Sequence, residues 1–198
     1  MDLVLASTSP TRALVLRQRG VRFRALSPTV DESAICADDP SWVALERARA
    51  KARSVARRAP SSVVVGADQV VYDPTCPSEH WGKPRDPAGA LARLRGCVGR
   101  AHVLLTGMVV WSGGRETSTT VSTVMHVRPD LTDAELQAYV RTGEGLGCAG
   151  AYAAEGRGAF LFERIEGDWT NVLGLPFAAL MGELREHGWR ADSAWEAP

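Results

Sequence analysis

Short apolar runs alternate with proline-initiated helices in the first half of this chain, and that alternation constrains the fold more than any other feature. The runs at 3–6 and 63–65 have the length and apolar character of buried strands. Between them, Ser9-Pro10 and Asp39-Pro40 are typical helix starts, because the polar side chain caps free amides and proline suits the first helical position. Strands that alternate with helices in this way predict an α/β fold.

The second half of the chain adds antiparallel character to the predicted sheet. Extended segments at 102–111 and 118–127 flank the turn signal Gly113-Gly114, which predicts a hairpin. We therefore expect an α/β fold with a mixed central sheet flanked by helices. The predicted helices begin near Pro10, Pro40, Pro87, Thr132 and Pro176, and the predicted strands cover 3–6, 21–26, 63–65 with an extended continuation to 72, 102–111, 118–127 and 159–165.

Length and charge limit the domain count and the kinds of partner. A chain of 198 residues predicts a single domain, 1–198, with two lobes and a frayed tail over 191–198. A formal net charge of zero argues against broad electrostatic binding of a nucleic-acid polymer or a membrane. The N-terminus lacks a signal-peptide pattern, and no run approaches the ~20 apolar residues of a bilayer span. The four cysteines show no zinc-site spacing, so we expect reduced thiols and a cytoplasmic location.

The scarcity of lysine singles out two positions. Of the 23 basic residues only Lys51 and Lys83 are lysines, so the other 21 are arginines. A GC-rich genome explains this bias, yet the same drift would turn dispensable lysines into arginine. The two that persist are therefore candidates for positions that need the compact ammonium group, which suits a flexible polyphosphate. A solvated helix face for Lys51 and an exposed loop for Lys83 are the alternatives.

Polar side chains follow both early strands. Ser7, Ser9 and Arg12 lie where the first strand gives way to a helix N-terminus, whose free amides and positive dipole end favour phosphate. A plain capping turn is the alternative interpretation. Asp68 directly follows a buried apolar run, where ligands gather in open α/β sheets, and Glu32 is a second carboxylate on a loop. Such carboxylates can bind a divalent cation or orient a water molecule.

Seven segments in order resemble the Maf family of nucleotide pyrophosphatases, and the resemblance covers almost the whole chain. One such segment would be weak evidence, but seven at compatible spacing are strong. The segments are LASTSPTR at 5–12, Val30-Asp31-Glu32, Ala50-Lys51-Ala52, VVGADQVV at 64–71, GKPRD at 82–86, the stretch 99–107, and CAGAYAAEGRGAFLFERIEGDWTNVLGLP at 148–176.

The resemblance implies a two-lobed architecture, similar to Maf and ITPase proteins, with a cleft between the lobes. It also implies hydrolysis of a nucleoside triphosphate at its α–β link, a divalent cation such as Mg²⁺ or Mn²⁺, and often a homodimer. Asp68 would act as the general base. The residues implicated are Ser7, Ser9 and Arg12 for phosphate oxygens, Asp68 and Glu32 for the cation and the water, and Lys51 and Lys83 for the charge that develops in the transition state.

Three positions bear on the choice of base. The family branch that acts on dTTP and UTP typically has arginine, threonine and glutamine at the positions of Thr11, Gln69 and Glu155. The branch that resembles 7-methyl-GTP pyrophosphatases has a different first residue, then glutamine and glutamate, as here. A carboxylate at Glu155 can accept both adjacent N–H donors of guanine, whereas a pyrimidine carbonyl would repel it. A solvated loop glutamate is the alternative. A cationic methylguanine could also stack on Trp81 or Tyr152.

We therefore expect a house-cleaning pyrophosphatase for a non-standard nucleotide, with 7-methyl-GTP as the first candidate substrate. The dTTP/UTP activity of the other family branch is the alternative enzyme. A regulator of cell division that binds a nucleotide without turning it over is a hypothesis from a different class, motivated by the family's association with septum formation.

Overall fold

The core of the computed structural model, which describes residues 1–192, is a six-stranded mixed sheet in the order β2-β1-β3-β4-β5-β6. β1 pairs in parallel with β2 and β3, whereas the pairs from β3 through β6 are antiparallel. The predicted α/β class and mixed sheet are confirmed. The strands are β1 (Leu3–Leu5), β2 (Arg24–Ala25), β3 (Val63–Tyr72), β4 (Ala101–Ser112), β5 (Arg115–Val127) and β6 (Phe162–Glu166).

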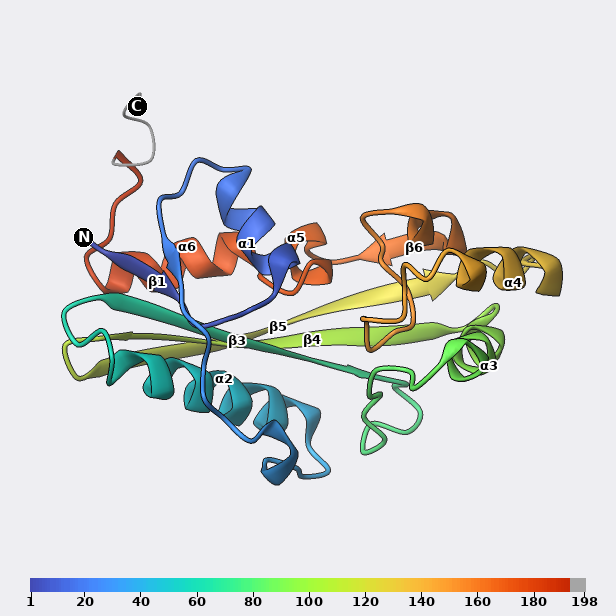
Figure 1. Cartoon of the computed structure of the whole chain (residues 1–198), viewed down its shortest axis with the longest axis horizontal. Coiled ribbons are helices and arrows are strands. Elements are labelled where there is room, and N and C mark those ends of the chain that lie inside the picture. Colours follow the sequence, from blue (N-terminus) through green and yellow to red (C-terminus); the bar gives the residue numbers. More distant parts are fainter. Residues whose placement is uncertain (193–198) are drawn as a thin grey trace.

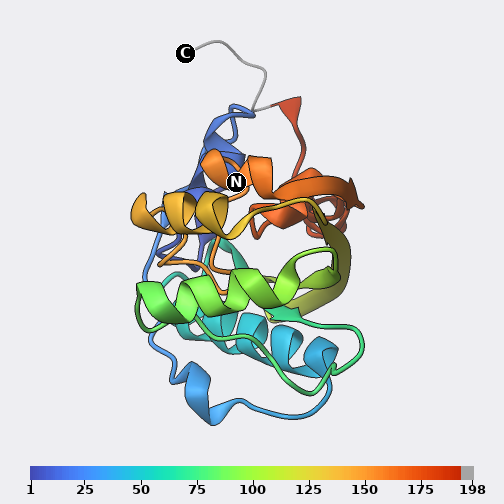
Figure 2. The ribbon, with the colours of Figure 1, turned by 90° about the vertical axis from the view of Figure 1, so that its right-hand side faces the viewer.

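Helices cover both faces of the sheet. Figure 1 shows α2 on one face and α1, α5 and α6 on the other, while α3 and α4 lie together beyond one end of the sheet (Figure 2). None of the helices among residues 1–192 combines the length and the apolar character that crossing a bilayer requires. The helices are α1 (Pro10–Arg17), α2 (Pro40–Ala56), α3 (Pro87–Cys97), α4 (Asp133–Arg141), α5 (Trp169–Val172) and α6 (Phe177–Glu186), with short 3-10 turns η1 (Glu32–Ala34) and η2 (Arg157–Leu161).

Two large hydrophobic clusters lie at opposite ends of the sheet and correspond to the two expected lobes. The first joins α1 and α6 to β1 and the start of β3, with Leu5, Leu16 and Leu180 fully buried. The second joins α3 and α4 to the other end of the sheet and to the loop that contains Tyr152. Ala191 packs against the first cluster. Residues 193–198 of the predicted tail lie outside the described residues.

The predicted helix starts are confirmed in their chemistry. Ser9, Asp39 and Asp86 each accept a hydrogen bond from an amide in the first turn of the following helix, and each precedes a proline. Thr132 and Glu135 form the predicted reciprocal capping box at the start of α4. These local signals need only the nearest residues, so the sequence is enough to place them.

The predicted strand at 21–26 is wrong in extent, because only Arg24–Ala25 pairs with β1. β1 is itself three residues long and offers this edge strand little to pair with. The predicted strand at 159–165 begins only at Phe162, since the preceding residues form η2 against the loop at Ala153. α5 was not predicted at all. It is four residues long, too short for a periodic pattern to reveal it.

The helix α2 lies unusually close to the sheet because two glycines face it. A Cβ atom at Gly66 would lie 2.3 Å from the carbonyl oxygen of Ala48, and one at Gly107 would lie 2.4 Å from the carbonyl carbon of Ala44. Gly107 pairs with Asp68 across β3 and β4, so the close approach occurs beside that carboxylate. The close position of α2 over the sheet therefore depends on the absence of a side chain at each of these two glycines.

We expect Gly107→Ala to destabilise the protein by about 1–3 kcal/mol, because the added methyl group must push the α2 backbone away from the sheet. Gly96→Ala is the matched control, since Gly96 lies in α3 with open space around it and the helix gains about 0.5–1 kcal/mol from the substitution. Urea unfolding of both variants measures the two changes. Equal effects at the two glycines would contradict the steric explanation.

Candidate active site

Asp68 lies on the part of β3 that extends beyond the end of β1. β1 pairs with only the first three residues of β3, Val63–Val65. Asp68 faces α2, and its Oδ1 accepts a hydrogen bond of 2.6 Å from Nζ of Lys51. Both side chains are buried, with 8% and 7% of their surfaces exposed. A buried lysine contributes favourably only when it is paired in this way, so the geometry favours the special role predicted for Lys51 over a solvated helix face.

Glu32 completes a three-residue cluster around the same ammonium group. Its Oε2 lies 2.9 Å from Lys51 Nζ, and its side chain is about half exposed at 46%. Partial burial raises the pKa of Glu32, but the hydrogen bond and charge of Lys51, together with Arg47, outweigh that effect and hold the pKa below its usual value. Arg47 also lies 3.9 Å from Asp68 Oδ2. The two carboxylates therefore converge on one point, and the lowered pKa keeps Glu32 ionised near neutral pH.

The N-terminus of α1 supplies polar groups close to this cluster. Ser9 caps the helix by accepting from the amide of Arg12, and Ser7 Oγ accepts from the amide of Ser9. Arg12 donates from Nε to the carbonyl of Gly174 at 2.8 Å and from Nη1 to Ser7 Oγ at 3.4 Å. Burial lowers the pKa of Arg12, and the charges of Asp68 and Glu32 oppose that shift. Thr11, predicted to bear on the substrate, lies half-buried beside Arg12.

Gln69 points to the opposite face of the sheet from Asp68, because successive strand residues alternate. Its amide nitrogen donates to the backbone carbonyl of Asn171 at 2.7 Å and to Thr106 Oγ1 at 3.1 Å. Since β1 ends before this point, both side chains lie next to an edge of β3 that β1 leaves open. Of the predicted site residues, Asp68 and Gln69 thus lie side by side at this edge, on opposite faces of the sheet.

Lys83 and Glu155 lie apart from the Asp68 cluster, on exposed loops of the second lobe. Burial raises the pKa of the Cys148 thiol, the charge of Glu155 adds to the shift, and the charge of Lys83 opposes it. Arg93 from α3 donates to the carbonyls of Gly82 and Ala149 and so joins the two loops. Among residues 1–192, no hydrogen bond or ion pair connects Lys83 to Asp68 or Glu32, and its role near a triphosphate stays a prediction.

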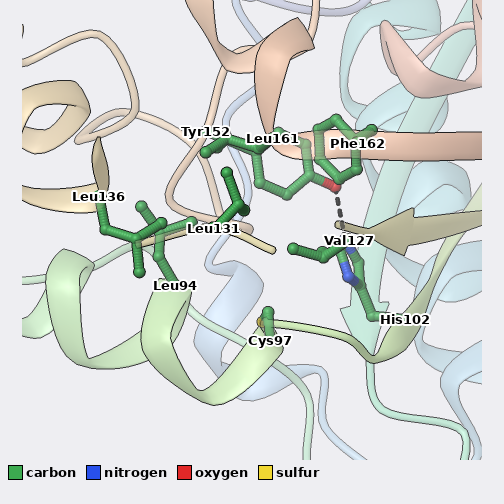
Figure 3. Close-up of a pocket in the computed structure, with 9 residues that line it drawn as sticks. All are labelled: Leu94, Cys97, His102, Val127, Leu131, Leu136, Tyr152, Leu161 and Phe162. Atoms are coloured by element: carbon green, nitrogen blue, oxygen red, sulfur yellow. Dashed lines mark hydrogen bonds between the residues drawn. The ribbon is translucent and has the colours of Figure 1, made fainter. Parts of the chain in front are cut away.

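The two aromatic residues considered for stacking differ in their surroundings. Tyr152 is buried and shares a hydrogen bond of 2.6 Å with His102, so its ring packs inside the protein and cannot stack on a base as suggested. Figure 3 shows this pair at one side of a small apolar cavity between α3, α4 and the end of the sheet. Burial lowers the pKa of His102 to about 4, which keeps the pair neutral. Trp81 is partly buried, with the guanidinium of Arg93 5.4 Å from its ring centre.

Three residues of the site escaped the sequence analysis. Arg47 and Arg93 carried no signal, because arginine is abundant throughout this chain. Asn171 did carry one: it is the chain's only asparagine, and it is fully buried beside Gln69. Its scarcity is a signal of the same kind as that of the two lysines.

A buried lysine–carboxylate cluster beside a helix N-terminus, at the edge of an α/β sheet, is a site suited to enzymes that act on phosphate-bearing substrates. Comparison with known proteins makes the assignment specific. The family model described as "Maf-like protein" matches residues 2–187. The chain therefore belongs to the Maf-like family, and it is an enzyme, a hydrolase.

Curated relatives match nearly the full length of the chain under three different names. A "dTTP/UTP pyrophosphatase" of Symbiobacterium thermophilum is 41% identical over 188 residues, which cover 95% of both chains. A "Nucleoside triphosphate pyrophosphatase" of Streptomyces coelicolor is 40% identical over 98% of this chain and 94% of its own length. A "7-methyl-GTP pyrophosphatase" of Syntrophotalea carbinolica is 36% identical over 95% of both chains.

We expect Lys51→Met to cost about 3–5 kcal/mol of unfolding free energy, because it leaves the buried carboxylate of Asp68 without its closest cation. The double variant Lys51→Met/Asp68→Asn should recover part of that loss, since the unpaired charge is removed as well. Lys83→Met is the matched control and should change stability by less than about 0.5 kcal/mol, because Lys83 is exposed. Chemical denaturation measures all three. Equal losses for the two single variants would contradict the assigned burial.

Proposed function

We propose that this protein is a nucleoside triphosphate pyrophosphatase that cleaves the α–β phosphoanhydride, with 7-methyl-GTP as its leading substrate. One observation carries the proposal: Lys51, Asp68 and Glu32 converge beside Arg12 and the N-terminus of α1. Cations and free amides on one side would bind the phosphates, and carboxylates on the other would hold a water molecule. The relatives' names support pyrophosphatase activity on a nucleoside triphosphate.

The chemistry of the cluster fits hydrolysis by attack of water on the α-phosphorus. Asp68 accepts the proton as the water oxygen bonds to phosphorus, and the bond to the bridging oxygen breaks to release pyrophosphate. Arg12 and Lys51 stabilise the negative charge that grows on the phosphate oxygens. Ser7 and Ser9 help to shape the turn that presents the amides of α1. The products are a nucleoside monophosphate and pyrophosphate.

The donor set also fits a divalent cation. Asp68 and Glu32 both contact Lys51 Nζ, so their oxygens lie close enough together to share one ion. Among the described residues, no group of three or more His, Cys, Asp or Glu side chains is placed to bind a metal. Mg²⁺ typically takes one or two carboxylates and completes its shell with water and substrate phosphates, which matches this pair. When bound, the ion would neutralise phosphate charge and polarise the reacting bond.

The choice of base rests on Gln69 and Glu155. An exposed Glu155 is acceptor-only and suits the paired N–H donors of guanine, which favours 7-methyl-GTP. The competing candidate is dTTP/UTP pyrophosphatase activity, which the name of the relative with 41% identity favours. Homodimer formation and a cytoplasmic location stay predictions.

We expect Asp68→Asn to lower pyrophosphate release at least ~100-fold, because the amide cannot accept the proton from water. Asp130→Asn, which removes an exposed carboxylate paired with Arg128, is the control and should keep full activity. The assay follows pyrophosphate and nucleoside monophosphate with 7-methyl-GTP, GTP, dTTP and UTP, each with Mg²⁺ and Mn²⁺. Orthophosphate in place of pyrophosphate would refute α–β cleavage. Tight binding without turnover in the wild type would favour the regulator hypothesis instead.

We expect Glu155→Gln to shift the ratio of kcat/KM for 7-methyl-GTP over UTP toward the pyrimidine, by about tenfold for one lost charge-assisted hydrogen bond. The kcat/KM for UTP should change little, because the residues proposed to bind the phosphates, Arg12 and Lys51, are unchanged. The exposed Glu163→Gln is the matched control, since it removes the same charge from β6. An equal fall on every substrate would show that Glu155 supports structure or catalysis rather than base selection.

A further inference from the structure

The side-chain amide of Gln69 is held in a single orientation by its neighbours. A primary amide has two N–H donors and one carbonyl oxygen. In Gln69 the nitrogen donates to the backbone carbonyl of Asn171 at 2.7 Å and to the hydroxyl of Thr106 at 3.1 Å. No hydrogen bond among residues 1–192 uses Oε1 of this half-buried side chain. Both donors are therefore occupied, and the carbonyl oxygen is the one polar atom left for a ligand.

This orientation follows from chemistry as well as from geometry. The carbonyl of Asn171 can only accept, so the atom that faces it must be the nitrogen of Gln69. Turning the amide over would place Oε1 against that carbonyl, with two lone pairs opposed and a buried hydrogen bond lost. Asn171 is fully buried, which makes the loss of that hydrogen bond costly.

Asn171 fixes the carbonyl that imposes this orientation. Its side chain is fully buried, and Nδ2 donates to the carbonyl of Leu104 in β4 at 3.1 Å and to Thr123 Oγ1 in β5 at 3.0 Å. These bonds tie α5 to two neighbouring strands. The same carbonyl of Asn171 accepts from the amide of Gly174 at 2.8 Å, and the carbonyl of Gly174 accepts from Arg12. One short segment thus positions both Gln69 and the phosphate-binding Arg12.

We propose that Asn171 is a positioning residue for base selection, which holds Gln69 so that only its acceptor oxygen meets the substrate, and that this selects keto bases over amino bases. Guanine presents N1–H and N2–H at its ring edge, so Oε1 can accept N1–H while Glu155 accepts N2–H, and uracil and thymine present N3–H. Adenine and cytosine present a ring-nitrogen lone pair at the same place, which Oε1 would repel. The inference rests on the proposed function, but it holds for the guanine and the pyrimidine candidates alike.

Side-chain amide exchange tests the positioning without any substrate. The chain has one asparagine and three glutamines, and Gln18 and Gln137 are exposed. We expect two slowly exchanging NH₂ pairs by NMR, from Gln69 and Asn171, and two fast ones. Asn171→Ala should remove one slow pair and speed exchange of the other at least tenfold. Unchanged protection of Gln69 in a folded Asn171→Ala variant would overturn the positioning role.

Paired kinetics test the selection itself. Wild-type kcat/KM should favour GTP over ATP and UTP over CTP by tenfold or more, and Asn171→Ala and Gln69→Leu should each lower that preference at least fivefold. Gln137→Leu is the matched control, because Gln137 is exposed on α4 and its amide donates to Asp133 rather than to any of these groups. If Asn171→Ala does not fold, Thr106→Val removes one of the two acceptors and should lower the preference in the same direction.

The outcomes distinguish failure of the proposed function from failure of the positioning role of Asn171. No pyrophosphate release from any triphosphate would refute the proposed function, while the amide exchange would still report on Asn171. Active variants with an unchanged keto-to-amino preference would overturn the inference and leave the function intact. A change confined to the ratio of GTP to dGTP would show that Oε1 meets the sugar rather than the base, which also overturns it.

Discussion

The buried ion pair between Lys51 and Asp68 is the interaction on which the arrangement of the site depends. It forms because α2 lies close enough to β3 and β4 for a lysine to reach a strand carboxylate, and that approach requires glycine at 66 and 107. Each partner would be costly to bury alone, so the pair also fixes the register of α2 over the sheet. Glu32 and Arg47 then extend the pair into a cluster with two carboxylates on one side.

A second constraint is the short length of β1. Because β1 pairs with only three residues of β3, the next part of β3 is open along one edge. Alternation along the strand sends Asp68 to the α2 face and Gln69 to the α5 face. Under the proposed function, a substrate at this edge would meet cations and carboxylates on one side and the amide of Gln69 on the other. The parallel half of the sheet supplies the open edge, and the antiparallel half supplies Thr106 and the strands that hold α5.

Local signals were predictable from the sequence and long-range geometry was not. The caps at Ser9, Asp39 and Thr132 act on amides a few residues away, so residue type and order determined them. β2 was predicted too long, because the number of residues that pair depends on the partner strand. α5 was missed because long-range contacts stabilise it: Asn171 is bonded to β4 and β5, and Asp168 caps only a single turn.

The sequence by itself determined the α/β class and the order of the motifs, because these depend on local pattern and residue type, and from the same pattern it supplied the candidate site residues. Only the tertiary structure decided which of those residues meet. Lys51 and Lys83 looked equivalent in the sequence, yet one is buried against Asp68 and the other lies exposed on a loop. The difference arises because an ammonium group is buried only where a helix brings it to a carboxylate, and that encounter is set by packing between segments far apart in the chain.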